Sequence, residues 1–308
     1  MRKFLALSEQ DQSLLLHLHR HIYLSRDFID KYIYNSNEEG KTTTAHEKSV
    51  YRRLKQLKDA EYITSFAVPT SPGSGRPSNI YTLDSFGVEM VEHMTGIKHW
   101  NYAWSKQPTI WYMHTLMLAD VVKSFETNAP PGLVIKDYAS EGKATFKYYE
   151  GTTNIKGSNK PKSHYIRPDG ILVIGLENSD EHNRGYMLEM ERSHADRSGT
   201  MRKLAQYNHF FSGRVERDDG TIDLSDAYKK RMKQFDEKVA LESPVKHENW
   251  KILFIGKDEK MGPRILKQLK GQKSEVPLLS ASKDDLMENP YGEVFRELDA
   301  PDKLIRGV

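Results

Sequence analysis

Three carboxylates lie at the ends of two apolar segments in the second half of the chain. Asp169 comes just before the apolar run 171–174, and Glu189 and Glu191 alternate with apolar residues over 186–191. Because side chains alternate between the two faces of a strand, both glutamates share one face. If the two segments pair as a hairpin, Asp169 lies near both. Clustered carboxylates suit Mg²⁺ or Mn²⁺, and such an ion can activate water against a phosphodiester.

The elements around these carboxylates alternate between strands and helices. Apolar runs predict strands at residues 133–138, 145–149, 250–255 and 277–280. Helical spacing of apolar residues predicts helices at residues 109–125, 198–211 and 263–269. The second of these helices places Lys203 and Tyr207 four residues apart, on one face. Alternating strands and helices of this kind predict an α/β domain.

A helix in the first half of the chain indicates a different activity. Thr44 and Glu47 fit a capping box, and Val50, Leu54 and Leu57 recur at the spacing of a buried helical stripe. The polar and cationic residues of this helix are the candidate DNA contacts: Thr44, His46, Lys48, Ser49, Arg52, Arg53 and Gln56. Cations contact phosphates, and Arg or Gln can also read base edges, so the pattern favours binding to DNA.

The residues after this helix predict a β-hairpin. Segments 62–68 and 79–83 predict its strands, and the Gly- and Pro-rich loop between them carries Arg76, a candidate contact to the minor groove or to phosphate. Two further helices are predicted upstream, and residues 84–95 predict a closing one. The order helix, helix, helix, hairpin is typical of a winged helix-turn-helix domain, whose third helix is presented to DNA.

Composition limits the classes of function. The 308 residues are long enough for two domains, and a net charge of +3 permits contact with nucleic acid without requiring it. The absence of cysteine excludes disulfides, thiolate nucleophiles and Cys-based metal sites. No apolar run reaches the length of a signal-peptide core or a membrane-spanning helix, so we expect a cytoplasmic protein with no membrane contact.

Changes in composition and in the periodicity of apolar residues divide the chain into two predicted domains. We expect a DNA-binding domain at 1–96, an aromatic linker at 97–108 and an α/β domain at 109–308. Residues 1–95 hold twelve Lys or Arg and twelve Asp or Glu, so the basic character is concentrated on the predicted third helix. A lysine-rich segment with Gly and Pro predicts a loop at 156–162. Two interpretations of that loop stay open, a contact to nucleic-acid backbone and a plain solvated loop.

Several motifs together resemble known families. Asp169 in Pro-Asp-Gly, the strand with Glu189 and Glu191, and the helix with Lys203 and Tyr207 resemble the core of the PD-(D/E)xK nucleases. Joined to the predicted winged helix, the chain resembles the replication-relaxation family of plasmids and other mobile elements. The expected fold is therefore α+β or α/β, with an N-terminal winged helix-turn-helix and a C-terminal PD-(D/E)xK-like α/β domain.

The resemblance implies a sequence-specific DNA-binding protein that acts in replication, in transfer or in their regulation. Its partner would be double-stranded DNA, and DNA binding would need no cofactor. Winged-helix proteins often read palindromes as dimers, so a homodimer is also expected. A further expected partner is a replication or transfer protein.

The nuclease pattern is not matched in full. Active cores of that superfamily carry Asp and then Glu-x-Lys, whereas Glu191 stands here at the position of the lysine. The resemblance implies that Lys203, on the helix that follows, supplies the ammonium group that the motif lysine would otherwise provide. A metal-dependent nickase would then use Asp169, Glu189, Glu191 and Lys203, with Mg²⁺ or Mn²⁺ held by the three carboxylates. Two alternatives stay open: a core that binds DNA without cutting it, and a transcriptional regulator whose second domain binds a partner protein.

Overall fold

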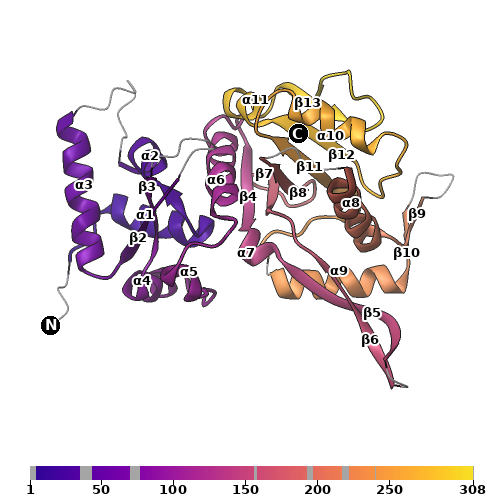
Figure 1. Cartoon of the computed structure of the whole chain (residues 1–308), viewed down its shortest axis with the longest axis horizontal. Helices are drawn as coiled ribbons and strands as arrows, with labels where there is room; N and C mark the ends of the chain where they lie inside the picture. Colours follow the sequence, from indigo (N-terminus) through magenta and orange to yellow (C-terminus); the bar gives the residue numbers. More distant parts are fainter. Residues whose placement is uncertain are drawn as a thin grey trace. The chain divides into compact units, whose positions relative to one another are not determined.

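The computed structural model describes residues 5–34, 44–69, 77–155, 158–192, 197–216, 222–239 and 241–307. Over these ranges the protein is a mixed α+β structure with eleven α-helices and a mixed seven-stranded sheet (Figure 1). The chain divides into two compact units, residues 1–120 and 121–308. No helix in the described ranges is long and apolar enough to cross a membrane.

The first unit combines short helices with a small antiparallel sheet. Its helices are α1 (Glu9–His21), α2 (Arg26–Ile29) with the π-helix η1 (Asp30–Tyr34), α3 (Thr44–Asp59), α4 (Ser85–Thr95) and α5 (Ala103–Lys106). Its strands, in sheet order, are β1 (Leu24–Ser25), β3 (Pro77–Leu83) and β2 (Ile63–Pro69). The predicted order of helix, helix, helix and hairpin is confirmed by α1, α2, α3 and the β2–β3 pair, which follow one another along the chain.

Apolar spacing explains why these helices pack together. Leu14, Leu15 and Leu18 of α1 are fully buried, and the predicted stripe of α3 is buried with them, at Val50, Leu54 and Leu57. Each such side chain contributes roughly 1.5–3 kcal/mol when it is removed from water. Burial of the stripe fixes the rotation of α3 about its axis, and thereby decides which of its polar residues face solvent.

The second unit is built on the seven-stranded sheet. In sheet order its strands are β14 (Ile305–Arg306), β13 (Glu293–Glu297), β12 (Leu278–Ser282), β11 (Trp250–Gly256), β8 (Arg184–Glu191), β7 (Gly170–Leu176) and β4 (Leu133–Ser140). A further pair is β9 (Arg214–Glu216) with β10 (Ile222–Leu224). The remaining helices are α7 (Glu141–Ala144), α8 (Arg197–Phe211), α9 (Asp226–Val239), η2 (His247–Asn249), α10 (Met261–Leu269) and α11 (Lys283–Glu288). Helix α6 (Tyr112–Thr127) contains the boundary between the units.

The pairing of β7 with β8 confirms the hairpin predicted from the sequence. The two strands are antiparallel, with Gly170 opposite Leu188, while β8, β11 and β12 run parallel. Apolar side chains of α8, α9 and α10 form one buried cluster with Met187, Ile252 and Leu278 of the sheet. The sheet therefore holds β8 rigidly between β7 and β11, with helices over one face.

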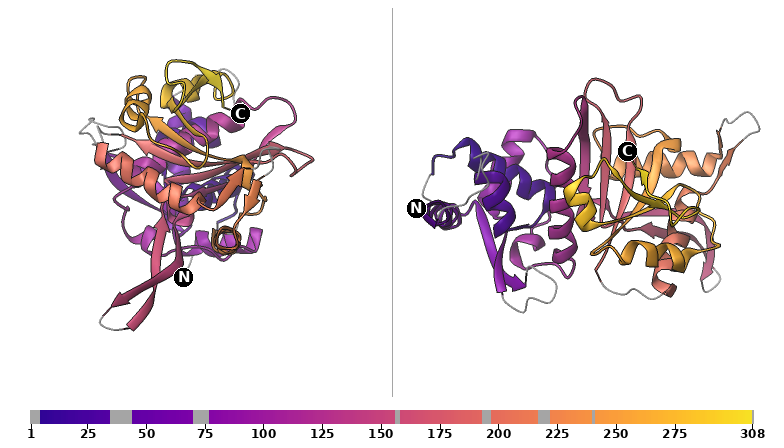
Figure 2. Two further views of the ribbon diagram at one scale, coloured as in Figure 1. Left: turned by 90° about the vertical axis from the view of Figure 1, so that its right-hand side faces the viewer. Right: turned by 90° about the horizontal axis from the view of Figure 1, so that it is seen from above.

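A two-stranded ribbon extends from the second unit. It consists of β5 (Phe146–Ile155) and β6 (Ser158–Ile166), and two views show it projecting away from the sheet (Figures 1 and 2). The prediction of a loop over 156–162 was wrong for the described residues from 158 onward, which lie in β6. Gly and Pro gave this segment the composition of a loop, but cross-strand pairing with β5 outweighs that local preference.

Candidate functional site

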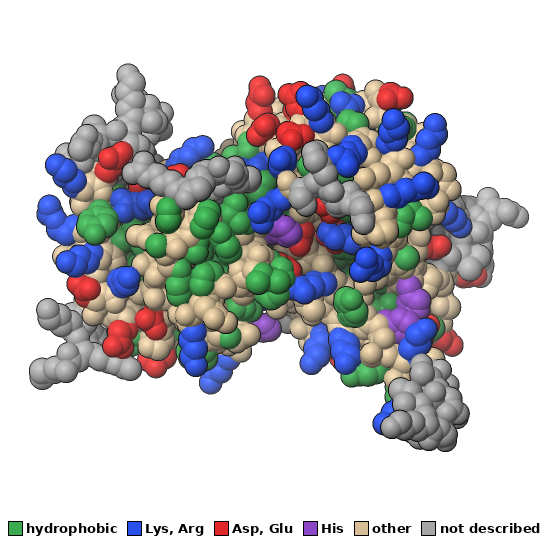
Figure 3. All heavy atoms as spheres, in the orientation of Figure 1, with side chains coloured by type: hydrophobic (Ala, Val, Ile, Leu, Met, Phe, Trp, Pro, Cys, Tyr) green, Lys and Arg blue, Asp and Glu red, His purple; other side chains and the backbone are tan. Residues whose placement is uncertain are grey.

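The exposed face of α3 carries four of the eight predicted DNA contacts. Lys48, Ser49, Arg52 and Gln56 are exposed, on the side of the helix opposite its buried stripe. Figure 3 shows Lys and Arg side chains, in blue, gathered over α3. Tyr51, which was not among the predicted contacts, is 59 % exposed on the same helix. The side chains of Thr44 and His46, and the whole of Arg76, lie outside the described residues.

Arg53 differs from its neighbours on α3 because it points into the unit. Its Nη2 lies 2.5 Å from Asp11 Oδ2, and its Nε donates to both carboxylate oxygens of Asp11 at 3.0 and 3.1 Å. Nη2 also donates to the carbonyl oxygen of Ala6. Only 24 % of the Arg53 side chain is exposed, and Asp11 is fully buried. The two side chains therefore tie α3 to α1.

Asp11 collects further hydrogen bonds. Tyr34 donates to Oδ1 at 2.7 Å, and the backbone N and the hydroxyl of Ser8 donate to Oδ2 at 2.7 and 2.8 Å. Burial by itself raises the pKa of Asp11, but the hydrogen bonds from Arg53, Tyr34 and Ser8 hold it below its ordinary value. This carboxylate is therefore stabilised in its charged form.

The three predicted carboxylates of the second unit lie on neighbouring strands. Asp169 directly precedes β7, where its N donates to Leu188 O at 2.9 Å and its Oδ2 accepts from Met190 N at 2.7 Å. Glu189 is 1 % exposed, and Asp169 and Glu191 are each 6 % exposed. Burial excludes the simplest alternative, a solvated strand face that carries acidic residues for solubility.

One ammonium group bridges the two glutamates. Lys203 Nζ on α8 lies 2.6 Å from Glu189 Oε2 and 3.1 Å from Glu191 Oε1. Tyr207, one turn further along α8, donates its hydroxyl to Glu189 Oε1 at 2.5 Å. The i, i+4 spacing seen in the sequence thus places both side chains over β8.

The protonation of this cluster reflects its crowding. Burial raises the pKa of Glu189 to about 7; the nearby Asp169 raises it too, while Lys203 and Tyr207 lower it. Burial lowers the pKa of Lys203, yet the charges of Glu189, Asp169 and Glu191 raise it above its ordinary value. Burial also raises the pKa of Tyr207. Perturbed groups gathered in this way are typical of functional sites, although ion-pair networks also produce them.

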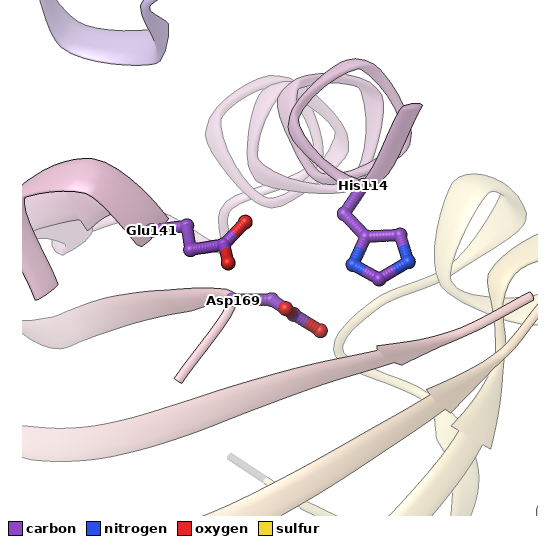
Figure 4. Close-up of side chains that lie close together, drawn as sticks. All are labelled: His114, Glu141 and Asp169. Atoms are coloured by element: carbon purple, nitrogen blue, oxygen red, sulfur yellow. The ribbon is translucent and has the colours of Figure 1, made fainter. Parts of the chain in front are cut away.

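A fourth carboxylate, which the sequence patterns did not indicate, lies near Asp169. Glu141 opens α7 directly after β4 and is 4 % exposed. One of its oxygens lies within 4.8 Å of an oxygen of Asp169, and Figure 4 shows the two side chains close together. Arg167 Nε lies 3.0 Å from Glu141 Oε1. His114, also drawn in Figure 4, belongs to α6 in the first unit. A glutamate that opens a four-residue helix has no sequence pattern of its own.

An open pocket of about 410 Å³ leads to the two glutamates. Its lining combines residues of β6, β8 and α8: Tyr165, Ile166, Arg167, Glu189, Glu191, Gly199, Arg202, Lys203, Gln206 and Tyr207. Two of the three predicted metal ligands, Glu189 and Glu191, line this pocket, whereas Asp169 does not. Carboxylate oxygens of this kind are the ligands that Mg²⁺ and Mn²⁺ prefer. Cationic side chains in the same lining also suit phosphate groups.

The two units together define a mixed α+β protein with an exposed cationic helix in one unit and a buried carboxylate–ammonium cluster in the other. By sequence the chain belongs to the replication-relaxation family, whose model matches residues 15–224, more than half of the chain. Membership of this family suggests a protein associated with plasmid replication. Comparisons with curated proteins and with solved structures find no match.

Proposed function

We propose that the protein binds double-stranded DNA sequence-specifically through α3, in the replication of a plasmid or mobile element, in its transfer or in their regulation. The observation that carries this proposal is the exposed face of α3, where Lys48, Ser49, Arg52 and Gln56 lie opposite a fully buried stripe. A helix of this kind can enter the major groove, because its apolar side is held by the unit while its polar side stays accessible.

In this proposal the first unit is a winged helix-turn-helix domain, with α3 as the recognition helix and the β2–β3 hairpin as the wing. Lys48 and Arg52 lie one turn apart and would meet phosphates or guanine edges. Gln56, one turn further, would offer the donors of its amide group to a base edge, since its Oε1 already accepts from Arg53 Nη1 at 3.1 Å. Arg53 anchors the helix through Asp11 and makes no base contact.

To test this proposal, the protein is first used to select a duplex from a random library, and its affinity for that duplex is then measured. Lys48→Ala with Arg52→Ala should weaken affinity about tenfold or more, and should reduce the slope of log K against log salt by about one for each lost phosphate contact. The matched control removes two cations elsewhere in the first unit, by Lys98→Ala with Lys106→Ala, both exposed. Equal affinities for the two double variants at one ionic strength would refute the assignment of α3.

The carboxylate cluster favours a second candidate function, metal-dependent cleavage of DNA by a PD-(D/E)xK-like second unit. Asp169, Glu189 and Glu191 would hold Mg²⁺ or Mn²⁺, with Glu141 beside Asp169. The observation in its favour is that the ammonium of Lys203 lies between two buried glutamates. From the sequence alone, Lys203 was only a lysine on the helix after the motif. A bound divalent cation would lower the pKa of water and stabilise the charge that develops on the phosphate.

The protein's own groups would then have distinct tasks. Lys203 lines the pocket, and in this proposal its Nζ would donate to a phosphate oxygen or to the attacking water. Tyr207 fixes the orientation of Glu189 through its hydroxyl. Arg167 and Arg202 lie along the same lining and would orient the phosphodiester.

Incubation of supercoiled plasmid with the protein and Mg²⁺ or Mn²⁺ tests the second candidate. We expect open-circular product with the wild type and none with Glu189→Gln or in EDTA. Nicking by both proteins alike would point to a contaminant and count against the site. Lys48→Ala with Arg52→Ala leaves the residues of the cluster unchanged, so nicking by that variant at high protein concentration would separate the chemistry of the cluster from DNA binding through α3.

A further inference from the structure

The base of the β5–β6 ribbon has one buried and one exposed face. On the buried face Phe146 pairs with Ile166 and Tyr148 with His164. On the exposed face Lys147 lies opposite Tyr165, and Tyr149 lies opposite Ser163. The exposed face is thus neither apolar nor simply charged, since it combines tyrosines with a lysine.

The two tyrosines of this face are unusually accessible. Tyr149 is 53 % and Tyr165 is 55 % exposed. The ammonium of Lys147 lies 5.3 Å from the centroid of the Tyr149 ring. Single exposed aromatics are common, but two on one face of a ribbon, with a cation against one of them, resemble a stacking surface more than a solvated strand.

A hollow between β6 and α8 continues from this surface. It measures about 300 Å³ and shares Tyr165, Arg202 and Gln206 with the pocket over the glutamates. Its walls include two stacked imidazole rings, His164 and His209, whose centroids lie 4.0 Å apart. Figure 3 shows Lys, Arg and His side chains beside the ribbon on this face of the second unit. Tyr165 lies on the exposed face of the ribbon and lines both the hollow and the pocket, so one groove runs from Tyr165 through the hollow to the pocket. Lys147, opposite Tyr165 in the ribbon, lies beside the start of this groove.

We propose that this groove binds unpaired nucleotides of single-stranded DNA, with bases stacked on Tyr165 and Tyr149 and phosphates held by Lys147 and Arg202. Base faces are covered in a duplex, so accessible tyrosine rings favour unpaired bases. The cations supply the attraction to the backbone that such sites require. Because the groove leads into the pocket, a bound strand would be guided toward Glu189 and Lys203.

The proposal adds a second DNA site to the function proposed above but rests on different residues. Full-length protein is titrated into a fluorescent single-stranded oligonucleotide and into a duplex of the same sequence, and anisotropy is measured. Tyr165→Ala should weaken single-strand binding at least about fivefold, the lower range for the loss of one base stack. Tyr165→Phe should retain affinity, because the ring remains.

Matched variants separate this site from α3. Arg202→Ala should weaken single-strand binding and reduce its salt slope by about one. Lys48→Ala with Arg52→Ala should weaken only duplex binding. Single-strand affinity unchanged by Tyr165→Ala would overturn the proposal, as would an equal loss for duplex and single strand. Tyr165 and Arg202 are both exposed, so we expect each variant to fold, and circular dichroism checks this.

Discussion

Each unit contains a buried carboxylate bound to a cation and to a tyrosine hydroxyl, yet the pKa values of the two carboxylates are shifted in opposite directions. In the first unit Asp11 meets Arg53 and Tyr34, and its pKa is held below the ordinary value. In the second unit Glu189 meets Lys203 and Tyr207, and its pKa is raised to about 7. Similar hydrogen-bond partners therefore accompany opposite shifts of the carboxylate pKa.

The difference comes from what surrounds each pair. The guanidinium of Arg53 donates to Asp11 and otherwise to neutral oxygens, those of Ala6 and Gln56, and Ser8 gives Asp11 two further donors. Glu189 shares its one ammonium with Glu191, and the charge of Asp169 acts against its ionisation. A carboxylate satisfied on all sides is a structural element, whereas carboxylates that compete for one cation are suited to accept another.

Removal of Arg53 should have the largest effect on stability. Arg53→Ala leaves the charge of Asp11 buried without its main partner, and we expect the first unit to lose about 3 kcal/mol of unfolding free energy. Arg52→Ala, on the exposed face, should change it by less than about 0.5 kcal/mol.

Tryptophan fluorescence during urea unfolding measures this contrast. In a Trp250→Phe background the remaining tryptophans, Trp100, Trp104 and Trp111, all lie in the first unit. Similar losses for Arg53→Ala and Arg52→Ala would mean that the Asp11 pair does not hold α3 to α1.

The two carboxylates should give stability opposite dependences on pH. The folded-state pKa of Asp11 is depressed, so its contribution is complete above the ordinary aspartate range and is lost as the pH falls through the folded pKa. The folded-state pKa of Glu189 is raised from 4.5 to about 7, so stability falls as the pH rises between those values.

Amide hydrogen exchange, corrected for intrinsic rates, can follow both units in one sample. Asp11→Asn should flatten the acid-side loss in α1 and α3. Glu189→Gln should flatten the loss near neutral pH in β8 and β11. A parallel pH dependence in the two units would contradict the assigned directions.

Replacement of Lys203 should raise the pKa of Glu189 further. In Lys203→Met the cluster loses its shared cation, and the titration midpoint of Glu189 should rise by about one unit or more, which corresponds to roughly 1.4 kcal/mol. ¹³C NMR of labelled glutamate carboxyls measures the midpoint, and Glu189→Gln identifies the resonance. Arg202→Met, on the exposed part of the same helix, serves as the control and should leave the midpoint in place.

The tyrosine hydroxyls should give the smallest effects. Tyr34→Phe and Tyr207→Phe each remove one hydrogen bond to a carboxylate, with an expected cost of about 1 kcal/mol. Both changes should raise the titration midpoint of the carboxylate that loses its donor. If Tyr207→Phe lowered the midpoint of Glu189, the hydroxyl would not be the donor in that bond.

The sequence by itself determined the local patterns of both units. Helical spacing predicted the buried stripe of α3 and placed Lys203 and Tyr207 on one face of α8. The alternation along β8 predicted that Glu189 and Glu191 share a side, and the predicted hairpin placed Asp169 against β8, where its Oδ2 accepts from Met190 N. These inferences succeed because they depend on the periods of helix and strand, which short stretches of sequence carry.

Tertiary structure alone decided which polar residues face inward. Helical spacing puts Arg53 at the edge of the buried stripe, three residues after Val50 and four before Leu57, but its partner Asp11 lies 42 residues away and is set only by the fold. Glu141 reaches Asp169 only because β4 pairs with β7. Lys160 and Lys162 lie in a strand because β5 supplies a partner. In each case the deciding energy comes from groups distant in the chain, whose placement no local pattern records.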